Sequence, residues 1–276
     1  MHGDAFTASD TAIADYLLNN HPKSLLQNAS EIAKILNLNI ATVTRFFMKL
    51  GYSSAREAMD DFREELEFII DSPLDRYGEI RLAPGVQEEE IADLLRVEQE
   101  NIAKTLAGVD MATLRAVAGL LSDARRKVFV VGAAKEHSVA HYLFKHLFSL
   151  RGNAFLVQEP HTINLMTSID ADSVCVIFDF RRYANTNRKV ARYAKQAGAK
   201  IVTISDSGFC PTALLANYQF TAVTKSSNMF DSYTAVISLV NLVSAQILNT
   251  EGRDFKEQLD RLETVYAELN TFGTSK

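Results

Sequence analysis

Two stretches of this sequence carry side chains of the kinds that bind other molecules. In residues 41–49, hydroxyl, small and basic side chains alternate with apolar ones, and the polar set can reach the base edges and phosphates of DNA. In residues 179–186, Arg181 and Arg182 are consecutive, and each guanidinium is a planar fork that can pair with a carboxylate or a phosphate. The elements around each stretch decide which of these side chains face outward.

The first stretch lies within residues 30–51, where the apolar spacing predicts two short helices joined by a tight turn. Ser30 is expected to cap the first helix, and Asn39 the second, over residues 40–50, which ends at Gly51. The predicted inward positions are Ile32, Ala33, Ile35, Leu36, Val43, Phe46, Phe47 and Leu50. This pattern is that of a helix-turn-helix.

The outward face of the second helix favours DNA as its partner. Hydroxyls and a methyl near its amino end can meet base edges, while Arg45 and Lys49 can reach guanine or phosphate. The predicted DNA-binding residues are Ser30, Ala41, Thr42, Thr44, Arg45 and Lys49. The alternatives are a helical hairpin with a solvated polar face and a protein-interaction module.

Further helices are predicted on both sides of this pair. One is capped by Ser9 or Asp10 and runs to residue 19, and another is capped by Ser53 or Ser54 and runs to residue 70. Residues 71–86 contain two prolines and two glycines and are predicted to be a linker. A helix over residues 88–106 follows, before one over residues 111–121. The apolar stripe of the helix over residues 88–106 is expected to pack on its own domain, with a dimer contact as the alternative. The stripe residues are Ile91, Leu94, Leu95, Ile102 and Leu106.

From residue 127 the pattern changes to short β-branched or aromatic runs separated by amphipathic helices. The predicted strands are residues 128–131, 154–157, 174–178, 201–204 and 218–221, and the last helices are residues 231–248 and 254–270. This alternation predicts an α/β domain in three layers, with a five-stranded parallel sheet between helices.

Ligands of an open parallel sheet collect at the carboxyl ends of its strands, which directs attention to the loops after the predicted strands. The candidate ligand-binding residues are Lys135, Glu136, His137, Ser138, Asp179, Arg181, Arg182, Tyr183, Ser205, Asp206 and Ser232. In one interpretation Arg181 or Arg182 binds an anionic ligand; in the other, the arginines pair with Asp179, Glu136 or a neighbouring subunit and hold the loops.

Composition sets further expectations. The net charge of −5 is mildly negative, yet residues 23–56 carry five basic residues against Glu31 alone, so the basic charge is concentrated around the helix pair. The separated Cys175 and Cys210 predict neither a disulfide nor a zinc site, and His137 with His141 lacks a third metal ligand. No secretion signal or transmembrane run is recognised, and we expect a cytoplasmic protein without cofactor or metal.

The run LNLNIATVTRFFMKLGYSSAREAMDDF resembles the DNA-binding half of the RpiR family of bacterial transcriptional regulators. RKVFVVGAAKEHSVAHYLFKHLFSLRG and VCVIFDFRRYANTNRKVARYAKQAGAKIVTISDS resemble the SIS (sugar isomerase) domain that this family carries. In phosphosugar-binding SIS domains the first loop is similar to Gly-x-Gly-x-Ser. Here Ala134 stands at the second glycine and Glu136 at the serine, so the resemblance favours an anion other than a simple sugar phosphate.

The resemblance implies three segments: a helix-turn-helix domain in residues 1–76, a linker and linker helix in residues 77–108, and an SIS domain for effector binding and oligomerisation in residues 109–276. It implies a homodimer or homotetramer that binds a double-stranded DNA operator and responds to a small anionic metabolite of sugar or carboxylate metabolism, without catalytic residues. The alternatives are an SIS-type sugar-phosphate isomerase or lyase, with Glu136 and His137 as acid and base, and a regulator without a small-molecule ligand.

Overall fold

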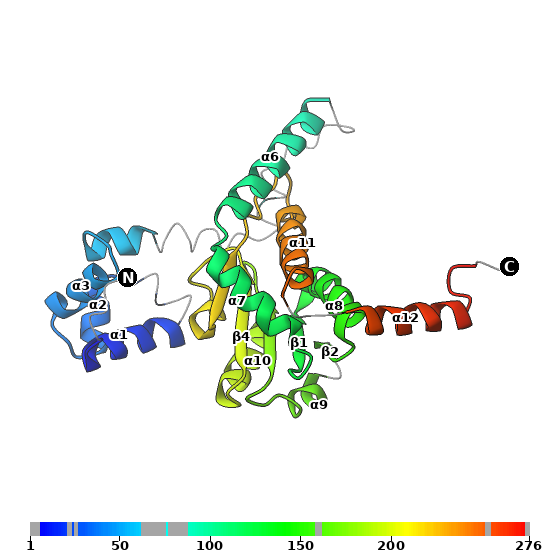
Figure 1. Cartoon of the computed structure of the whole chain (residues 1–276). Coiled ribbons are helices and arrows are strands. Elements are labelled where there is room, and N and C mark those ends of the chain that lie inside the picture. The colour runs from blue at the N-terminus through cyan, green and yellow to red at the C-terminus, as the bar shows by residue number, and fades with distance from the viewer. Residues whose placement is uncertain are drawn as a thin grey trace. The chain divides into compact units, whose positions relative to one another are not determined.

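The computed structural model describes residues 6–20, 24, 27–61, 76, 88–157, 162–251 and 255–273 (Figure 1). The chain divides into two compact units, Met1–Asp75 and Arg76–Lys276. Apart from Arg76, the predicted linker over residues 71–86 lies outside the described residues, and so do positions 62–70 of the predicted helix before it.

The first unit is helical. Its helices α1 (Ala8–Asn19), α2 (Ala29–Ile35) and α3 (Ile40–Lys49) are followed by a helical segment at residues 55–61. They share one apolar core, made of Ile13, Ile32, Ala33, Val43, Phe46, Phe47, Ala55, Ala58 and Met59. The helices α2 and α3 are the predicted pair, and Gly51 after them has the positive φ of 101° that a glycine accommodates. The exposed Ile35 and Leu50 were wrongly expected to face inward.

Two of the predicted helix caps are corrected. Thr7, rather than Ser9 or Asp10, caps α1, and Asp10 completes the capping box by accepting a hydrogen bond from the Thr7 amide. Asn28, rather than Ser30, caps α2, because its side-chain oxygen accepts from the amides of Ser30 and Glu31. The Asn39 cap of α3 is confirmed by its hydrogen bond from the Ala41 amide.

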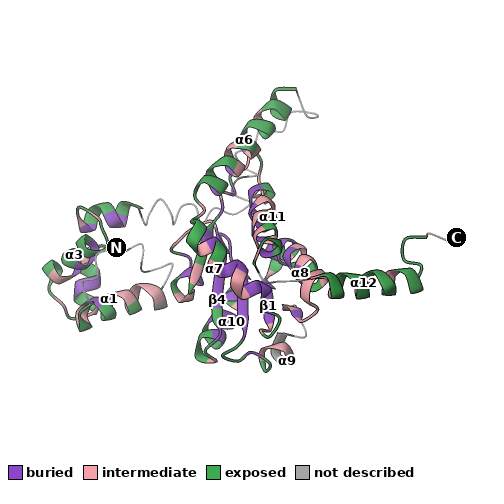
Figure 2. Ribbon diagram, in the orientation of Figure 1, coloured by how far each residue is buried: buried purple, intermediate pink, exposed green. Residues whose placement is uncertain are grey.

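The second unit is built on the predicted parallel sheet. Its strands are β1 (Val128–Gly132), β2 (Ala154–Val157), β3 (Val174–Phe178), β4 (Lys200–Ser205) and β5 (Tyr218–Thr221). They lie in the order β2-β1-β3-β4-β5, with every neighbouring pair parallel. All residues of the central strands β1 and β3 are buried, as expected for a sheet covered on both faces (Figure 2).

Helices cover both faces of this sheet, which confirms the three-layer α/β/α fold. The helices α7 (Met111–Ser122), α8 (His137–Arg151) and α11 (Thr234–Leu248) pack on one face, where Val130, Val176 and Val202 point. On the other face, α9 (Thr162–Met166) and α10 (Asn185–Gln196) lie near Val131 and Ile177. The last described helix is α12 (Lys256–Glu268), which has no buried residue (Figure 2).

The helix α6 (Glu88–Ala107) packs on α11, but with a different face from the predicted one. Its buried residues are Val97, Asn101 and Thr105, whereas Ile91, Leu94, Leu95 and Leu106 of the predicted stripe are exposed. The reason is hydrogen bonding: Asn101 donates to the Lys225 carbonyl at 2.7 Å, and the Val223 amide donates to the Thr105 hydroxyl at 2.9 Å. Buried backbone groups need such partners, and polar side chains supply them here.

No single helix in the described ranges is long and apolar enough to cross a membrane; α6 and α7 pass that test only as a pair bent by 84°. Cys175 in β3 and Cys210 after β4 are both buried and free. Burial raises the pKa of the Cys175 thiol to about 12 and that of Cys210 to about 11.

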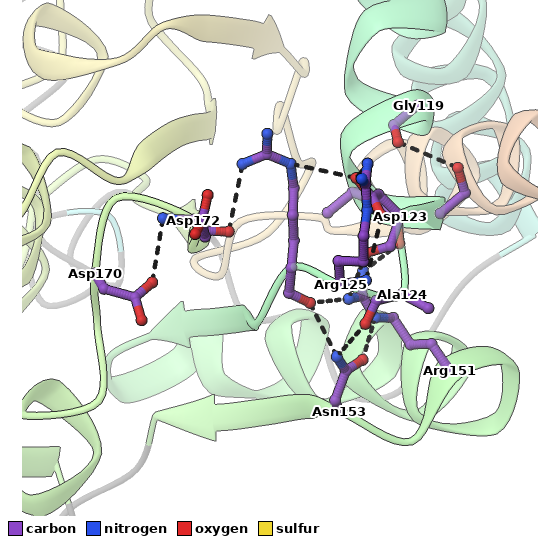
Figure 3. Close-up of polar contacts among 11 residues, drawn as sticks. Gly119, Asp123, Ala124, Arg125, Arg151, Asn153, Asp170 and Asp172 are labelled. Carbon is purple, nitrogen blue, oxygen red and sulfur yellow. Dashed lines mark hydrogen bonds and ion pairs between the residues drawn. The ribbon is translucent and has the colours of Figure 1, made fainter.

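At the amino-terminal edge of the sheet, side chains donate hydrogen bonds to backbone carbonyls (Figure 3). Arg151, at the end of α8, donates to the carbonyls of Leu121, Asp123 and Arg126. Asn153 donates from its amide group to Ala124 at 2.8 Å and to Arg126 at 3.0 Å. Two side chains therefore hold the loop between α7 and β1 in place.

Candidate functional site

The candidate ligand site lies at the opposite, carboxyl-terminal edge, in the loops that follow β1, β3 and β4. The short 3₁₀ helix η2 (Ala134–Glu136) follows β1 directly and leads into α8. A Cβ at Gly132 would lie 2.7 Å from the Glu136 carbonyl oxygen and 2.9 Å from the Ala140 Cβ, so only glycine permits this close approach. Gly132 thereby brings Lys135 and Glu136 to the sheet edge.

Three basic side chains converge there on the carboxylate of Asp231. Arg181, after β3, and Lys135, in η2, both form ion pairs with it, and the Arg76 Nη1 lies 3.4 Å from its Oδ1. The Asp231 side chain is 1% exposed and that of Arg181 5%, whereas Lys135 remains 43% exposed. We call these four residues the Asp231 cluster. It contains one carboxylate and three cations, and Arg181 pairs with a partner that the sequence did not indicate.

A layer of buried polar groups lies beneath this edge. Asp179 accepts hydrogen bonds from Asn187 at 3.0 Å and from the Thr212 hydroxyl at 2.9 Å, and burial raises its pKa to about 6. The Ser205 hydroxyl donates to the Asp179 carbonyl. Both were predicted to bind ligand, and the structure gives both partners inside the domain.

Asp206, after β4, supports the loop that carries Arg181. Its carboxylate accepts from the Arg181 amide at 2.9 Å and from the Tyr183 hydroxyl at 3.3 Å, and burial raises its pKa. Asp206 therefore fixes the backbone of Arg181, while Asp231 holds its guanidinium.

Glu136 is buried at the same edge. The Tyr233 hydroxyl lies 3.4 Å from its carboxylate, and burial raises the Glu136 pKa to about 7. Glu136 therefore titrates near neutral pH, and a group of this kind can exchange a proton with a bound molecule.

The remaining candidates lie outside this buried group. Arg182 is exposed and has a left-handed φ of 68°, whereas its neighbour Arg181 is buried. The Ser138 hydroxyl donates to the Lys135 carbonyl at 2.9 Å. His137 is half-buried, with its ring centroid 6.0 Å from that of His141, and the described residues contain no group of three side chains that could hold a metal ion.

Ser232 joins the site to α6. Its hydroxyl donates to Glu98 at 2.7 Å, and its amide donates to the Thr224 carbonyl at 3.2 Å. The sequence interpretation placed residue 231 at the start of the last long helix, but α11 begins at Thr234. Asp231 and Ser232 therefore belong to the irregular segment before α11, where their side chains are committed to cations and to Glu98.

The candidate DNA interface is the outer face of α3. Arg45 is exposed, and its Nη2 lies 3.5 Å from the Thr42 hydroxyl. Thr44 donates back to the Ile40 carbonyl at 3.1 Å, and Ala41 and Ser30 are exposed. These positions form a small, polar surface around one arginine.

Lys49 differs from the other predicted DNA contacts because it has a partner in its own unit. Its Nζ lies 2.7 Å from the buried carboxylate of Asp10, and this hydrogen bond lowers the Asp10 pKa to about 2. Lys49 therefore joins α3 to α1, a structural role in addition to the predicted phosphate contact.

Sequence reasoning missed three residues of the ligand edge: Asp231, Arg76 and Tyr233. Asp231 was predicted only as the first residue of the helix over residues 231–248, and Arg76 lay in a proline- and glycine-containing stretch predicted to be a linker. The sequence holds one signal for Asp231, because an acidic residue just before a long apolar helix is a candidate ion-pair partner for the consecutive Arg181 and Arg182.

Comparison with known proteins identifies a family domain within the second unit. The family model for the SIS domain matches residues 120–245. A helix-turn-helix transcriptional regulator of Clostridium perfringens, itself uncharacterised, is 22% identical over 273 residues, which cover 96% of this chain and 95% of the relative.

Solved structures show the same fold. The sugar isomerase domain of an RpiR transcription factor from Sphaerobacter thermophilus superposes with a TM-score of 0.59 at 22% identity, covering 64% of this chain and 98% of that one. NanR of Vibrio vulnificus, solved with ManNAc-6P, has a TM-score of 0.55 at 15% identity and covers 96% of this chain and 94% of its own.

Proposed function

We propose that the chain is a helix-turn-helix transcriptional regulator of the RpiR type with a carboxy-terminal SIS domain. In this proposal it binds an operator through α3 and senses a small anionic metabolite at the Asp231 cluster. The single observation that carries the proposal is the convergence of Arg76, Lys135 and Arg181 at the carboxyl edge of the sheet, where ligands of such sheets bind.

For DNA binding, the support is the exposed polar surface of α3, with Arg45 at its centre. We expect Arg45→Ala to weaken operator binding by about 10- to 100-fold without lowering the melting temperature, since a base contact from arginine contributes about 1–3 kcal/mol. The operator is first selected from random duplexes with the wild-type protein, and affinity is then measured by fluorescence anisotropy at fixed salt.

The matched control is Arg56→Ala, which removes an equally basic side chain that is 90% exposed but lies beyond α3 and pairs with Asp60. Its affinity is expected to fall only slightly. An operator affinity of Arg45→Ala equal to that of wild type would contradict the proposal that α3 is the recognition helix.

For the effector, the proposal is a phosphosugar, a sugar acid or another carboxylate. Three cations at one site favour an anion, and the NanR relative was solved with a phosphorylated sugar. A thermal-shift screen against phosphosugars, sugar acids, keto acids and amino acids tests this, because a ligand that binds the folded state raises its melting temperature. A carboxylate that stabilises the protein and changes its operator affinity is the expected result.

A second candidate function is supported by one observation, the pKa of about 7 at Glu136. A carboxyl group that titrates near neutrality can act as a general acid or base, as an SIS-type isomerase or lyase would need. Turnover assays on aminosugar and ketose phosphates distinguish the two candidates. Turnover that Glu136→Gln abolishes would favour the enzyme, and its absence together with operator binding favours the regulator.

A homodimer or homotetramer is also part of the proposal, since paired helix-turn-helix units match the two half-sites of an operator. The exposed Ile91, Leu94 and Leu95 of α6 provide apolar surface for such an assembly. Sedimentation equilibrium measures the oligomeric state, and Leu95→Glu is expected to shift it toward the monomer. As a DNA-binding regulator of a bacterial type, the protein is proposed to act in the cytoplasm.

A further inference from the structure

We propose that Asp231 is a resident anion that the effector displaces: an incoming phosphate or carboxylate takes its place on Arg181 and Lys135, and the displacement is passed to α6 through the segment 222–233. This inference rests on the proposed function, because it states how the effector of that site would act. It adds that the site is occupied by the protein's own carboxylate until the effector arrives.

The contacts of Asp231 favour exchange. Its carboxylate carries one negative charge, yet it lies against three cations, so a phosphate dianion offers more charge and more acceptor oxygens to the same donors. Asp231 also lies in a segment without helix or strand, directly before α11, so its movement breaks no regular element. Lys135 remains 43% exposed, which leaves the cluster open to solvent on its side.

The same segment is bound to α6 at three points along the helix. Glu98 accepts from Ser232, Asn101 donates to the Lys225 carbonyl, and Thr105 accepts from the Val223 amide. These contacts are spaced over two turns of one face, so α6 and the segment form a single hydrogen-bonded unit. Displacing Asp231 pulls on the end of the segment next to Ser232 and loosens the contact with Glu98 first.

Asp231 also contacts the first residue of the second unit. The Arg76 Nη1 lies 3.4 Å from its Oδ1, and Arg76 is the first residue of that unit along the chain. An effector anion that replaces Asp231 therefore changes the contacts of both Arg76 and α6, the parts of the second unit closest in sequence to the DNA-binding unit. Through these contacts, binding of an anion at the site would alter the amino-terminal part of the second unit.

The first test measures binding of inorganic phosphate by isothermal titration calorimetry to wild type, Asp231→Asn and Asp170→Asn. A resident competitor lowers apparent affinity in proportion to the fraction of sites it occupies, so Asp231→Asn is expected to bind phosphate about tenfold or more tightly than wild type. Asp170→Asn is the matched control, because Asp170 pairs with Lys127 at the opposite edge of the sheet. Its phosphate affinity is expected to equal that of wild type.

Phosphate affinity in Asp231→Asn equal to or below that of wild type overturns the proposal. No phosphate binding to either protein also overturns it, and favours a regulator whose cationic site is permanently filled by Asp231.

The second test needs only the wild-type protein, so it holds even where Asp231→Asn does not fold. Hydrogen exchange measured by mass spectrometry is expected to become at least about twofold faster in the segment 222–233 and in α6 when phosphate saturates the site. The Val223 amide is then released more often from Thr105, and the backbone of α6 loses its contact with the segment. Exchange in α10, on the other face of the sheet, should not change. Phosphate binding with unchanged exchange in α6 overturns the coupling.

Neither test contains DNA, so their outcome is separate from that of the operator-binding experiment. A protein that binds phosphate and loosens α6 but binds no operator contradicts the proposed function and leaves the exchange of anions standing. A protein that binds an operator and responds to a metabolite, with no gain of affinity in Asp231→Asn, contradicts only the inference about Asp231.

Discussion

The two edges of the parallel sheet each hold an arginine, but they satisfy it in different ways. At the amino edge, Arg151 donates to three backbone carbonyls (Figure 3). At the carboxyl edge, Arg181 pairs with the side chain of Asp231. A backbone carbonyl cannot leave without unfolding its loop, whereas a carboxylate on an irregular segment can rotate away. The first arrangement fits a permanent structural contact, and the second fits a site whose occupant changes.

The carboxyl groups at the two edges also differ in the direction of their pKa shifts. At the amino edge, hydrogen bonding from Lys127 lowers the pKa of Asp170, which is half exposed. At the carboxyl edge, burial raises the pKa of Glu136, Asp179 and Asp206. The ionised carboxylate is thus stabilised at the amino edge and disfavoured by burial at the carboxyl edge. Carboxyl groups whose ionised form is disfavoured are common at functional sites.

The largest effect on stability is expected at the amino edge. Arg151→Ala removes a donor from the carbonyl oxygens of Leu121, Asp123 and Arg126, of which that of Arg126 keeps its hydrogen bond from Asn153, and we expect a loss of about 4 kcal/mol in the free energy of unfolding. Urea denaturation followed by circular dichroism measures it. Arg125→Ala, at the same edge but with an 87% exposed side chain, is the control and should leave the free energy of unfolding close to that of wild type, because solvent screens its ion pair with Asp123. A small loss in the Arg151 variant would remove the distinction between the edges.

The second prediction concerns pH. The pKa of Glu136 is raised from 4.5 to about 7, so the folded protein keeps a proton that the unfolded chain releases at lower pH. Glu136 therefore reduces stability as pH rises through this window, by up to about 3 kcal/mol above pH 7. Glu136→Gln should be more stable than wild type at pH 8 and equal to it near pH 4.5. A stability difference that is the same at both pH values would contradict the burial argument.

The third prediction separates stability from ligand response at the carboxyl edge. Arg181→Met is expected to cost about 2 kcal/mol, less than a fully broken buried pair, because Asp231 keeps Arg76 and Lys135 as partners. The same variant should lose the rise in melting temperature that anions are proposed to give the wild type. Thermal melts with and without phosphate measure both quantities, and a full anion response in the variant would make Arg181 purely structural.

The smallest effect is expected for the exposed pair at the amino edge. Lys127→Met should change stability by about 0.5 kcal/mol, because solvent screens an ion pair whose members are 37% and 50% exposed. Its pH dependence should run opposite to that of Glu136. The Asp170 pKa is lowered, so the contribution of the pair is present above the pKa of the unfolded chain and is lost as pH falls. Urea titrations at pH 3 and pH 7 compare the two.

Much of the fold could be predicted from sequence because its signals are local. The strands at residues 154–157, 174–178 and 218–221 match their predicted bounds, since each is a β-branched or aromatic run with clear ends. The Asn28 cap was also readable, because Glu31 stands three residues later, as in a capping box. Choosing Ser30 instead moved the start of α2 by two residues.

The contacts that build the candidate site could not be predicted, because their partners are far apart in sequence. Arg181 and Asp231 are brought together by the order of the strands, and Arg76 comes from outside the sheet altogether. The prediction of the buried face of α6 was wrong for a related reason. Its apolar stripe has the correct helical period, but the backbone of the segment 222–226 needs hydrogen-bond partners, and Asn101 and Thr105 provide them.

The burial of both cysteines has a practical consequence for labelling chemistry. Thiol-reactive dyes attack the thiolate, and the raised pKa values of Cys175 and Cys210 keep these thiols protonated as well as inaccessible. A cysteine introduced on the exposed side of α6, as in Ala103→Cys, would therefore be the main reactive thiol of the described residues. With no tryptophan in the sequence to contribute background emission, a dye at that position could report the arrival of an effector in real time.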